Sequence, residues 1–327
     1  MSNYLRTIAI IESCIIVVLL FSTAFLYLDK KESKEKSKTG DRGGLLSTRI
    51  YTGLLEPKSL LILNYAPLRK SFKDFISENN VNVSIYVENL RSGAYMGIDE
   101  RRGYSAASLS KVPLAMLIMK KIEEKKLSFD TLLEINETSR TKTWGNLYSS
   151  SENKLTVGIL IKKMLSESDN TAFNVLFLYP DMEDMQLLLN YLDYYSEESD
   201  ESSEEYLITP KSMYNVFSSL YFSTFLNAEN SEYILSSLTN TTFDIKSLAE
   251  LPSNATVAHK FAAKYNGTYR GFHDCGIIYY NEQRVFYCVM TKDMSYETAV
   301  QVVGAVVNKI FYYSLGTRQE LDTYKRG

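Results

Sequence analysis

Histidine and cysteine are scarce in this chain of 327 residues, which has 2 His and 3 Cys. A structural zinc site uses about four Cys or His ligands, commonly spaced as C-x-x-C, and no such pair occurs in the chain. With only His259 and His273 present, both a His-rich metal site and a Ser-His-Asp triad are disfavoured. We therefore expect no metal and no cofactor, and we expect any nucleophilic chemistry to use a base other than histidine.

A basic bias is also absent, because 36 Lys and Arg face 39 Asp and Glu and the formal net charge is −3. Proteins that bind nucleic acid usually carry a basic patch or stripe, so we do not expect nucleic acid as a partner. Hydrophobic residues make up 45% of the chain, which is enough for one sizeable domain core. The composition leaves the oligomeric state undetermined.

One long apolar run is present, from residue 8 to residue 28, with Glu12 as its only charge. A run of this length can span a bilayer, and it lacks the A-x-A-like exit of a cleaved signal peptide. We expect residues 1–29 to form a single-pass membrane anchor. Residues 30–53 are rich in Lys, Glu, Ser and Gly and predict a flexible tether, which leaves 54–327 as the folded domain.

Strand-like and helical segments follow one another in a simple order. Alternating apolar residues predict strands at 83–87, 94–98, 256–261, 276–280 and 285–291. Apolar residues at helical spacing predict helices at 54–79, 108–125, 155–165, 182–194, 211–222, 232–238 and 299–313. Strands at both ends with helices between them predict an α/β (α+β) fold, in which one antiparallel sheet carries an all-helical subdomain at about 125–250.

Ser108 and Lys111 form a Ser-x-x-Lys pattern at the start of a helix-compatible run. Residues three apart share one face of a helix, so the hydroxyl and the amine point into the same space. A serine becomes an effective nucleophile when a neighbouring base takes its proton, and a lysine serves as that base when burial lowers its pKa. The pattern is short, and its weight depends on the rest of the chain.

Two further motifs follow in order. Ser168-Asp169-Asn170 begins 60 residues after Ser108, and Lys260 follows 92 residues later on a predicted strand. Ser-x-x-Lys, Ser-Asp-Asn and a strand lysine occur in this order in penicillin-recognising serine enzymes. Over residues 80–315 the sequence resembles the class A β-lactamase-related family, which includes penicillin-binding-protein-like enzymes. The resemblance implies a five-stranded antiparallel sheet flanked by helices, with the active site between sheet and helical subdomain.

The resemblance also implies roles for particular residues. Ser108 would attack an amide carbonyl, Lys111 would take its proton, and Ser168 would relay a proton to the leaving nitrogen. Lys260 would supply positive potential for the substrate carboxylate.

Two more residues would contact the substrate. Asn170 would hydrogen-bond the substrate amide, and the backbone N–H groups of Ser108 and Ala263 would form the oxyanion hole.

Two departures from the family pattern are visible. The expected Lys-Thr-Gly is Lys260-Phe261-Ala262, so the hydroxyl that would bind a substrate carboxylate is missing. The imidazole of His273 is one nearby candidate to replace it. The deacylating motif Glu-x-x-Leu-Asn is also missing, and an acidic run at 196–205 occupies the comparable place. Such a charge run more often forms a solvated loop.

These features predict a membrane-anchored serine hydrolase that forms an acyl-enzyme on Ser108 with peptidoglycan peptides or β-lactams and releases the acyl group slowly. A true class A β-lactamase with a different deacylating base is an alternative. A catalytically silent relative that binds cell-wall fragments is another.

The side of the membrane is disputed within the sequence. Five lysines follow the apolar run and only Arg6 precedes it, so the positive-inside rule places the domain in the cytoplasm. Cell-wall and β-lactam chemistry belongs outside the cytoplasm, and we expect that location because the ordered motifs are the more specific signal. Cys275 and Cys288 lie on neighbouring predicted strands, and we favour free buried thiols over a pair.

Overall fold

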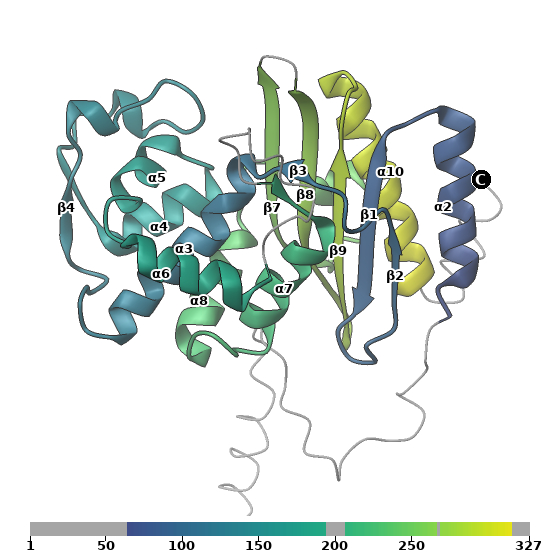
Figure 1. Cartoon of the computed structure of the whole chain (residues 1–327), viewed down its shortest axis with the longest axis horizontal. Helices are drawn as coiled ribbons and strands as arrows, with labels where there is room; N and C mark the ends of the chain where they lie inside the picture. Colours follow the sequence, from purple (N-terminus) through teal and green to yellow (C-terminus); the bar gives the residue numbers. More distant parts are fainter. Residues whose placement is uncertain (1–63, 194–206, 267–268, 316–327) are drawn as a thin grey trace, which may run out of the picture. The chain divides into compact units, whose positions relative to one another are not determined.

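The structure is a computed structural model that describes residues 64–193, 207–266 and 269–315 (Figure 1). The expected membrane anchor at 8–28, the tether at 30–53 and the acidic run at 196–205 lie outside these residues. Within the described ranges, no helix is long and apolar enough to cross a membrane.

A five-stranded antiparallel sheet has the strand order β2-β1-β9-β8-β7. Its strands are β1 (Val83–Asn89), β2 (Tyr95–Ile98), β7 (Thr256–Asn266), β8 (Tyr269–Tyr280) and β9 (Gln283–Thr291). The early hairpin β1–β2 joins the late strands through the pairing of β1 with β9 (Figure 1). This confirms the prediction of one antiparallel sheet built from both ends of the domain.

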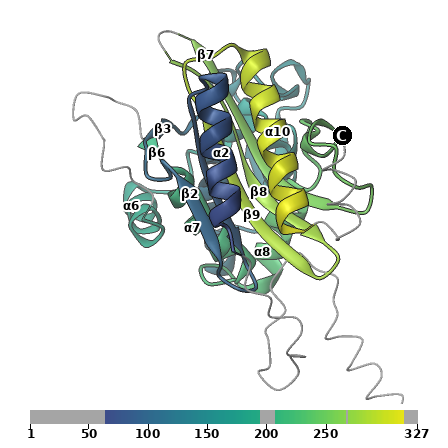
Figure 2. The same ribbon diagram turned by 90° about the vertical axis from the view of Figure 1, so that its right-hand side faces the viewer.

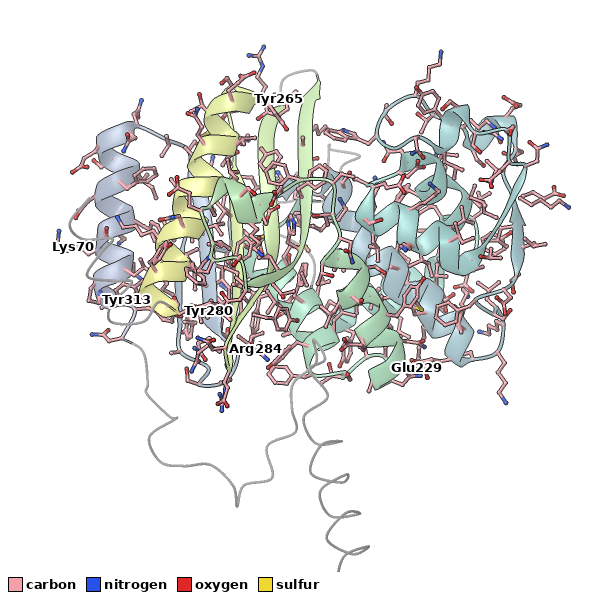
Figure 3. The ribbon with its side chains drawn as sticks, turned by 180° about the vertical axis from the view of Figure 1, so that it is seen from behind. Lys70, Glu229, Tyr265, Tyr280, Arg284 and Tyr313 are labelled. Atoms are coloured by element: carbon pink, nitrogen blue, oxygen red, sulfur yellow. A yellow bond between two sulfur atoms is a disulfide. The ribbon has the colours of Figure 1, made fainter. Side chains whose placement is uncertain are left out.

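Both faces of the sheet are buried, because side chains of a strand alternate between its two sides. The helices α2 (Ala66–Asn79) and α10 (Tyr296–Ser314) run side by side over one face (Figure 2). On that face the ring of Tyr280 on β8 contacts Phe311 on α10, with centroids 5.0 Å apart (Figure 3). Apolar residues of the helical region cover the other face and form a second core with it.

Most of the chain between β1–β2 and β7 is helical, as the sequence predicted. The longer helices are α3 (Lys111–Glu123), α4 (Val157–Ser166), α5 (Asn170–Leu176), α6 (Met182–Tyr191), α7 (Pro210–Tyr221), α8 (Ala228–Leu238) and α9 (Ile245–Leu248). Two small sheets were not predicted, because strands of two or three residues carry no periodic signal: β3 (Tyr104–Ser105) pairs with β6 (Leu207–Ile208), and β4 (Leu132–Glu134) pairs with β5 (Lys154–Thr156).

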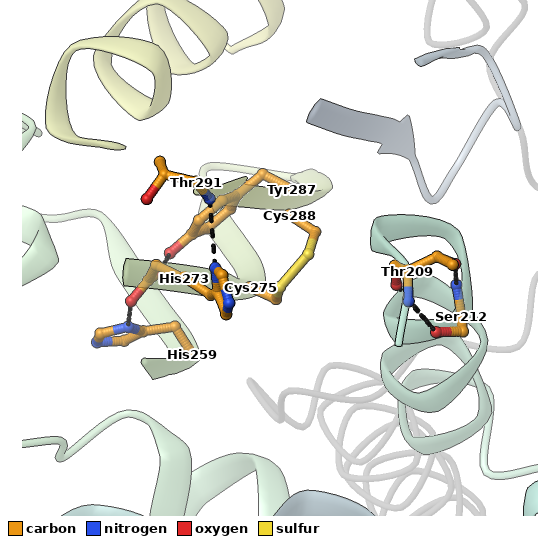
Figure 4. The surroundings of a disulfide bond; sticks show 9 residues. Thr209, Ser212, His259, His273, Cys275, Tyr287, Cys288 and Thr291 are labelled. Atoms are coloured by element: carbon orange, nitrogen blue, oxygen red, sulfur yellow. Dashed lines mark hydrogen bonds and ion pairs between the residues drawn. A yellow bond between two sulfur atoms is a disulfide. The ribbon is translucent and has the colours of Figure 1, made fainter. Parts of the chain in front are cut away.

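The cysteines of β8 and β9 correct the expectation of free thiols. Cys275 and Cys288 are directly opposite each other in the strand register, and their sulfur atoms are bonded (Figure 4). Residues opposite each other on antiparallel strands have Cβ atoms ~5 Å apart, within reach of a disulfide. The sequence located both strands but could not give their register, and the register decides whether the two thiols meet.

Candidate active site

Ser108 lies on the 3₁₀ turn η2 (Ala107–Ser110), which leads directly into α3. Ala107 has a positive φ of 39°, an uncommon conformation for a residue with a Cβ, and such strain concentrates at functional sites. The neighbouring Leu109 is fully buried and anchors the turn in the helical core. Ser108 itself is half-buried, so its hydroxyl lies at the surface of the site.

Lys111 is the buried partner of this serine, with a side chain only 2% exposed. Its Nζ donates to the backbone oxygen of Ser168, to Ser168 Oγ at 3.1 Å and to Asn170 Oδ1. Burial lowers the pKa of Lys111 to about 7, although the charge of Asp169 acts in the opposite direction. Within the described residues, no carboxylate hydrogen-bonds to Lys111. The neutral amine, which is the form that can take a proton, is therefore populated near neutral pH.

Ser168 lies between two lysines and is fully buried. Lys111 Nζ is 3.1 Å from Ser168 Oγ, and Lys260 Nζ donates to the same oxygen at 2.9 Å. Ser168 also has a positive φ of 55°, which turns the chain sharply just before α5 begins. Since both lysines approach Oγ, the hydroxyl can pass a proton between Lys111 and a substrate atom above it.

Lys260 comes from β7, the edge strand of the sheet, and has no exposed surface. Besides Ser168, its Nζ donates to the backbone oxygen of Phe261 at 2.9 Å. Burial first, and the positive charge of Lys111 second, hold the pKa of Lys260 well below its usual range, while Asp274 acts in the opposite direction.

Asp169 and Asn170 fix the loop that faces the strand. The buried Asp169 carboxylate caps α5 by accepting from Ala172 N at 2.8 Å, and it accepts from Leu147 N at 2.8 Å. Asn170 holds the same loop, because its Nδ2 donates to Thr143 Oγ1.

Thr143 and Trp144 were missed by the sequence analysis. Asn170 N donates to Trp144 O at 2.9 Å, so the loop follows the Ser-Asp-Asn motif closely. A glycine signals the contact: Gly145 has φ +91°, and a Cβ there would lie 2.1 Å from Asp169 Oδ2. The sequence shows the glycine but not the carboxylate against it.

Ala263 lies on β7 beyond Lys260, and its side of the strand follows from the pattern of the peptide groups. The backbone oxygen of Phe261 accepts from Lys260 Nζ, which directs the peptide groups of Phe261 toward the free edge. In an antiparallel strand the residue two positions on has the same direction. The N–H of Ala263 therefore also faces the free edge of β7, on the side where η2 contacts this strand. This placement is consistent with the predicted oxyanion donor.

His273 does not lie where a substrate would reach it. It is fully buried on β8, its Nδ1 accepts from Thr291 N at 3.3 Å, and its ring contacts the edge of Tyr104. Burial lowers its pKa to about 4, so the ring is neutral, and it also hydrogen-bonds the backbone of Ser105. The expectation that His273 replaces the missing hydroxyl is not supported: the ring braces β3, just before the turn that carries Ser108.

The structure thus brings together the four predicted catalytic residues from three separate elements. A nucleophile at the surface, a lysine with a lowered pKa and a serine bridged by a second lysine are the parts needed for acyl transfer. The description of the β-lactamase enzyme family matches residues 67–313. The chain belongs to this family.

Individual relatives of this family member are distant. The β-lactamase VEB-1 of Pseudomonas aeruginosa is 24% identical over 247 residues, which cover 69% of this chain and 82% of the relative. Among solved structures, the extended-spectrum β-lactamase TLA-3 has a TM-score of 0.69 at 18% identity, covering 78% of this chain and 100% of that one. PBP-A has a TM-score of 0.65 at 20% identity, covering 75% and 96%.

Proposed function

We propose that the chain is a serine acyl-transfer enzyme that forms an acyl-enzyme on Ser108 with β-lactams or peptidoglycan peptides. The observation that carries the proposal is the group around Ser168 Oγ, where Lys111 and Lys260 both lie within 3.1 Å in a fully buried position. Two buried lysines on one serine hydroxyl keep protons mobile at a site where a serine three residues before Lys111 is open to substrate.

The acylation step uses these residues in order. Neutral Lys111 takes the proton of the Ser108 hydroxyl while Oγ forms a bond to the substrate carbonyl carbon. The N–H groups of Ser108 and Ala263 stabilise the oxyanion, a type of donor whose loss typically costs about 10²–10³ in rate. The carbonyl–nitrogen bond then breaks, and the proton moves from Lys111 through Ser168 to the leaving nitrogen. Lys260 remains positive potential beside the developing charge.

Slow deacylation is part of the proposal. The sequence lacks the Glu-x-x-Leu-Asn motif, and within the described ranges Lys111 and Lys260 have no carboxylate hydrogen-bond partner. A water without a positioned base attacks an ester slowly, because general base catalysis typically contributes about 10²–10⁴ in rate. One solved PBP-A structure is an acyl-enzyme complex with penicillin G, which supports the same chemistry for this chain.

The test is intact-mass spectrometry of the purified protein after incubation with penicillin G and with a D-Ala-D-Ala thioester. We expect an adduct of one acyl group that is lost in Ser108→Ala and retained in Ser110→Ala, the neighbouring serine whose hydroxyl hydrogen-bonds Ala107 O. No adduct with any of these compounds would reject the proposal.

The named relatives favour one alternative, a β-lactamase with an unrecognised deacylating base, because VEB-1 is a β-lactamase. Rapid, continuous hydrolysis of nitrocefin would support that alternative, whereas a single burst followed by a stable adduct excludes it. A silent cell-wall-binding relative is the outcome if Ser108→Ala leaves ligand affinity unchanged and no adduct forms.

We also propose that residues 8–28 anchor the chain in a membrane, with the domain on the extracytoplasmic side. The proposal rests on the apolar run and on the substrate chemistry. In a protease-protection experiment on sealed, right-side-out vesicles, the domain should be digested without detergent; protection of the domain would place it in the cytoplasm instead.

A further inference from the structure

The side of the site next to Lys260 is aromatic where the family pattern predicts a hydroxyl. Phe261, directly after Lys260, is 2% exposed. Its ring contacts Phe243 with centroids 5.3 Å apart and Phe272, on the neighbouring strand β8, at 6.3 Å. Two adjacent strands therefore present aromatic rings at the place where the resemblance puts the carboxylate of the substrate.

Trp144 extends this aromatic cluster (Trp144, Phe243, Phe261 and Phe272) to the solvent. Its indole meets the edge of Phe261 at 5.5 Å, and its side chain is 41% exposed. The loop that carries it is held by Asn170, through the bond to Trp144 O. A large exposed aromatic residue next to a binding group commonly marks contact with a ligand rather than with solvent.

Lys260 cannot compensate for the missing hydroxyl from its present position. Its ammonium has no exposed surface and lies 4.3 Å from the centroid of the Phe261 ring, and its donors are directed to Ser168 Oγ and Phe261 O. A substrate carboxylate at this place would lose its hydration against aromatic rings without gaining a free donor, which is strongly unfavourable.

Lys264 is the competing cation. It lies two positions beyond Ala262 on β7, and its Nζ donates to Ser105 Oγ at 3.3 Å, close to the turn that carries Ser108. A role for Lys264 in holding a carboxylate predicts a preference for acids, which is opposite to the preference that the aromatic cluster predicts.

We infer that this enzyme accepts acyl donors whose group at this position is neutral and apolar, such as an ester or amide with an aromatic substituent, in preference to a free carboxylate. This inference rests on the proposed acylation of Ser108. The reaction is unchanged: Oγ bonds to the acyl carbon, the carbonyl–nitrogen bond breaks, and the nitrogen receives the proton.

Penicillin G, its methyl ester and its benzyl ester provide the test, because they share one acyl group and differ only at the carboxylate. The rate of adduct formation on the wild-type protein is measured by intact mass at equal concentrations. We expect the benzyl ester to react about 10-fold faster than the free acid or more, the range that one well-formed pocket contact provides. An equal or faster reaction of the acid overturns the inference, and loss of that acid reaction in Lys264→Met assigns the carboxylate to Lys264.

Variants locate the preference. Phe261→Thr restores the hydroxyl and should shift the preference toward the acid, while Phe261→Leu, the matched control, should keep the preference for esters. Because Phe261 is buried and its variants can fail to fold, Trp144→Ala at an exposed position gives a second measurement. It should reduce the rate ratio of benzyl to methyl ester, and an unchanged ratio counts against contact with the indole.

The two levels of the account fail differently. If none of the three penicillins and no fluorophosphonate, a small neutral serine probe, modifies Ser108, the proposed function is wrong. If adducts form on Ser108 but the free acid reacts as fast as the esters, only the inference about the substrate is wrong.

Discussion

At the scale of single residues, the site depends on where positive charge is tolerated. Lys111 and Lys260 are both buried and both contact Ser168 Oγ. Two ammonium groups so close together repel each other, and burial adds to the cost of each charge. One lysine therefore gives up its proton readily, and Lys111 is the one beside the nucleophile.

The pKa of Lys111, lowered by burial to about 7, predicts the pH dependence of acylation. The neutral amine is the active base, so the acylation rate should rise as the pH increases through about 7 and then reach a plateau. Rapid-quench measurement of adduct formation between pH 5 and 9 checks this. A rate that falls with rising pH over that range would show that the protonated form is the active one.

Removing the bridging hydroxyl should slow acylation while leaving the fold intact. Ser168→Ala loses the proton relay, and we expect a decrease of about 10²-fold or more in the acylation rate, typical of general acid–base groups. The matched control is Ser166→Ala on α4, whose hydroxyl bonds the backbone of Lys162. Equal effects of the two variants would argue against a relay through Ser168.

At the scale of elements, the start of α5 is the joint on which the site depends. Asp169 caps this helix and also accepts from Leu147 N, so one buried carboxylate positions both Asn170 and the loop with Trp144. The sequence offered Ser-Asp-Asn either as a catalytic motif or as an ordinary cap, and the structure shows that its middle residue is a cap. The two interpretations are compatible.

Asp169→Ala should therefore lower the free energy of unfolding by about 2–4 kcal/mol, because two buried N–H groups lose a charged acceptor. Asp181→Ala is the control: it removes the equivalent cap from α6, where Asp181 is 67% exposed, and should cost only about 1 kcal/mol. Urea unfolding of both variants measures the difference. Similar losses would mean that the second contact of Asp169 contributes nothing.

The bond between β8 and β9 gives a direct count of free thiols. Alkylation of the full-length chain in denaturant without reductant should modify one cysteine, Cys14, because Cys275 and Cys288 are joined. After reduction, all 3 cysteines should react. Three modifications before reduction would show that the two strand cysteines are free.

At the scale of the whole molecule, the sequence predicted the sheet and most helices because their periodic patterns are long. It predicted Ser108, Lys111, Ser168 and Lys260 because three ordered motifs are far more specific than one. It failed where the answer depends on strand register or on packing between distant segments.

Two residues show the limit clearly. The pairing of Cys275 with Cys288 depends on a register that a one-residue slip would change. His273 is close in sequence to the missing hydroxyl, yet alternation along β8 places it in the interior. The aromatic cluster likewise joins residues from four distant segments, which no local pattern predicts.

The most direct test of the central claim is peptide mapping of the full-length protein, denatured at set times after mixing with penicillin G. The account predicts a penicilloyl group on the peptide that contains Ser108, close to one per chain at saturation and still present after free penicillin is removed. An unmodified Ser108 at saturating penicillin, or modification of a different residue, would contradict it.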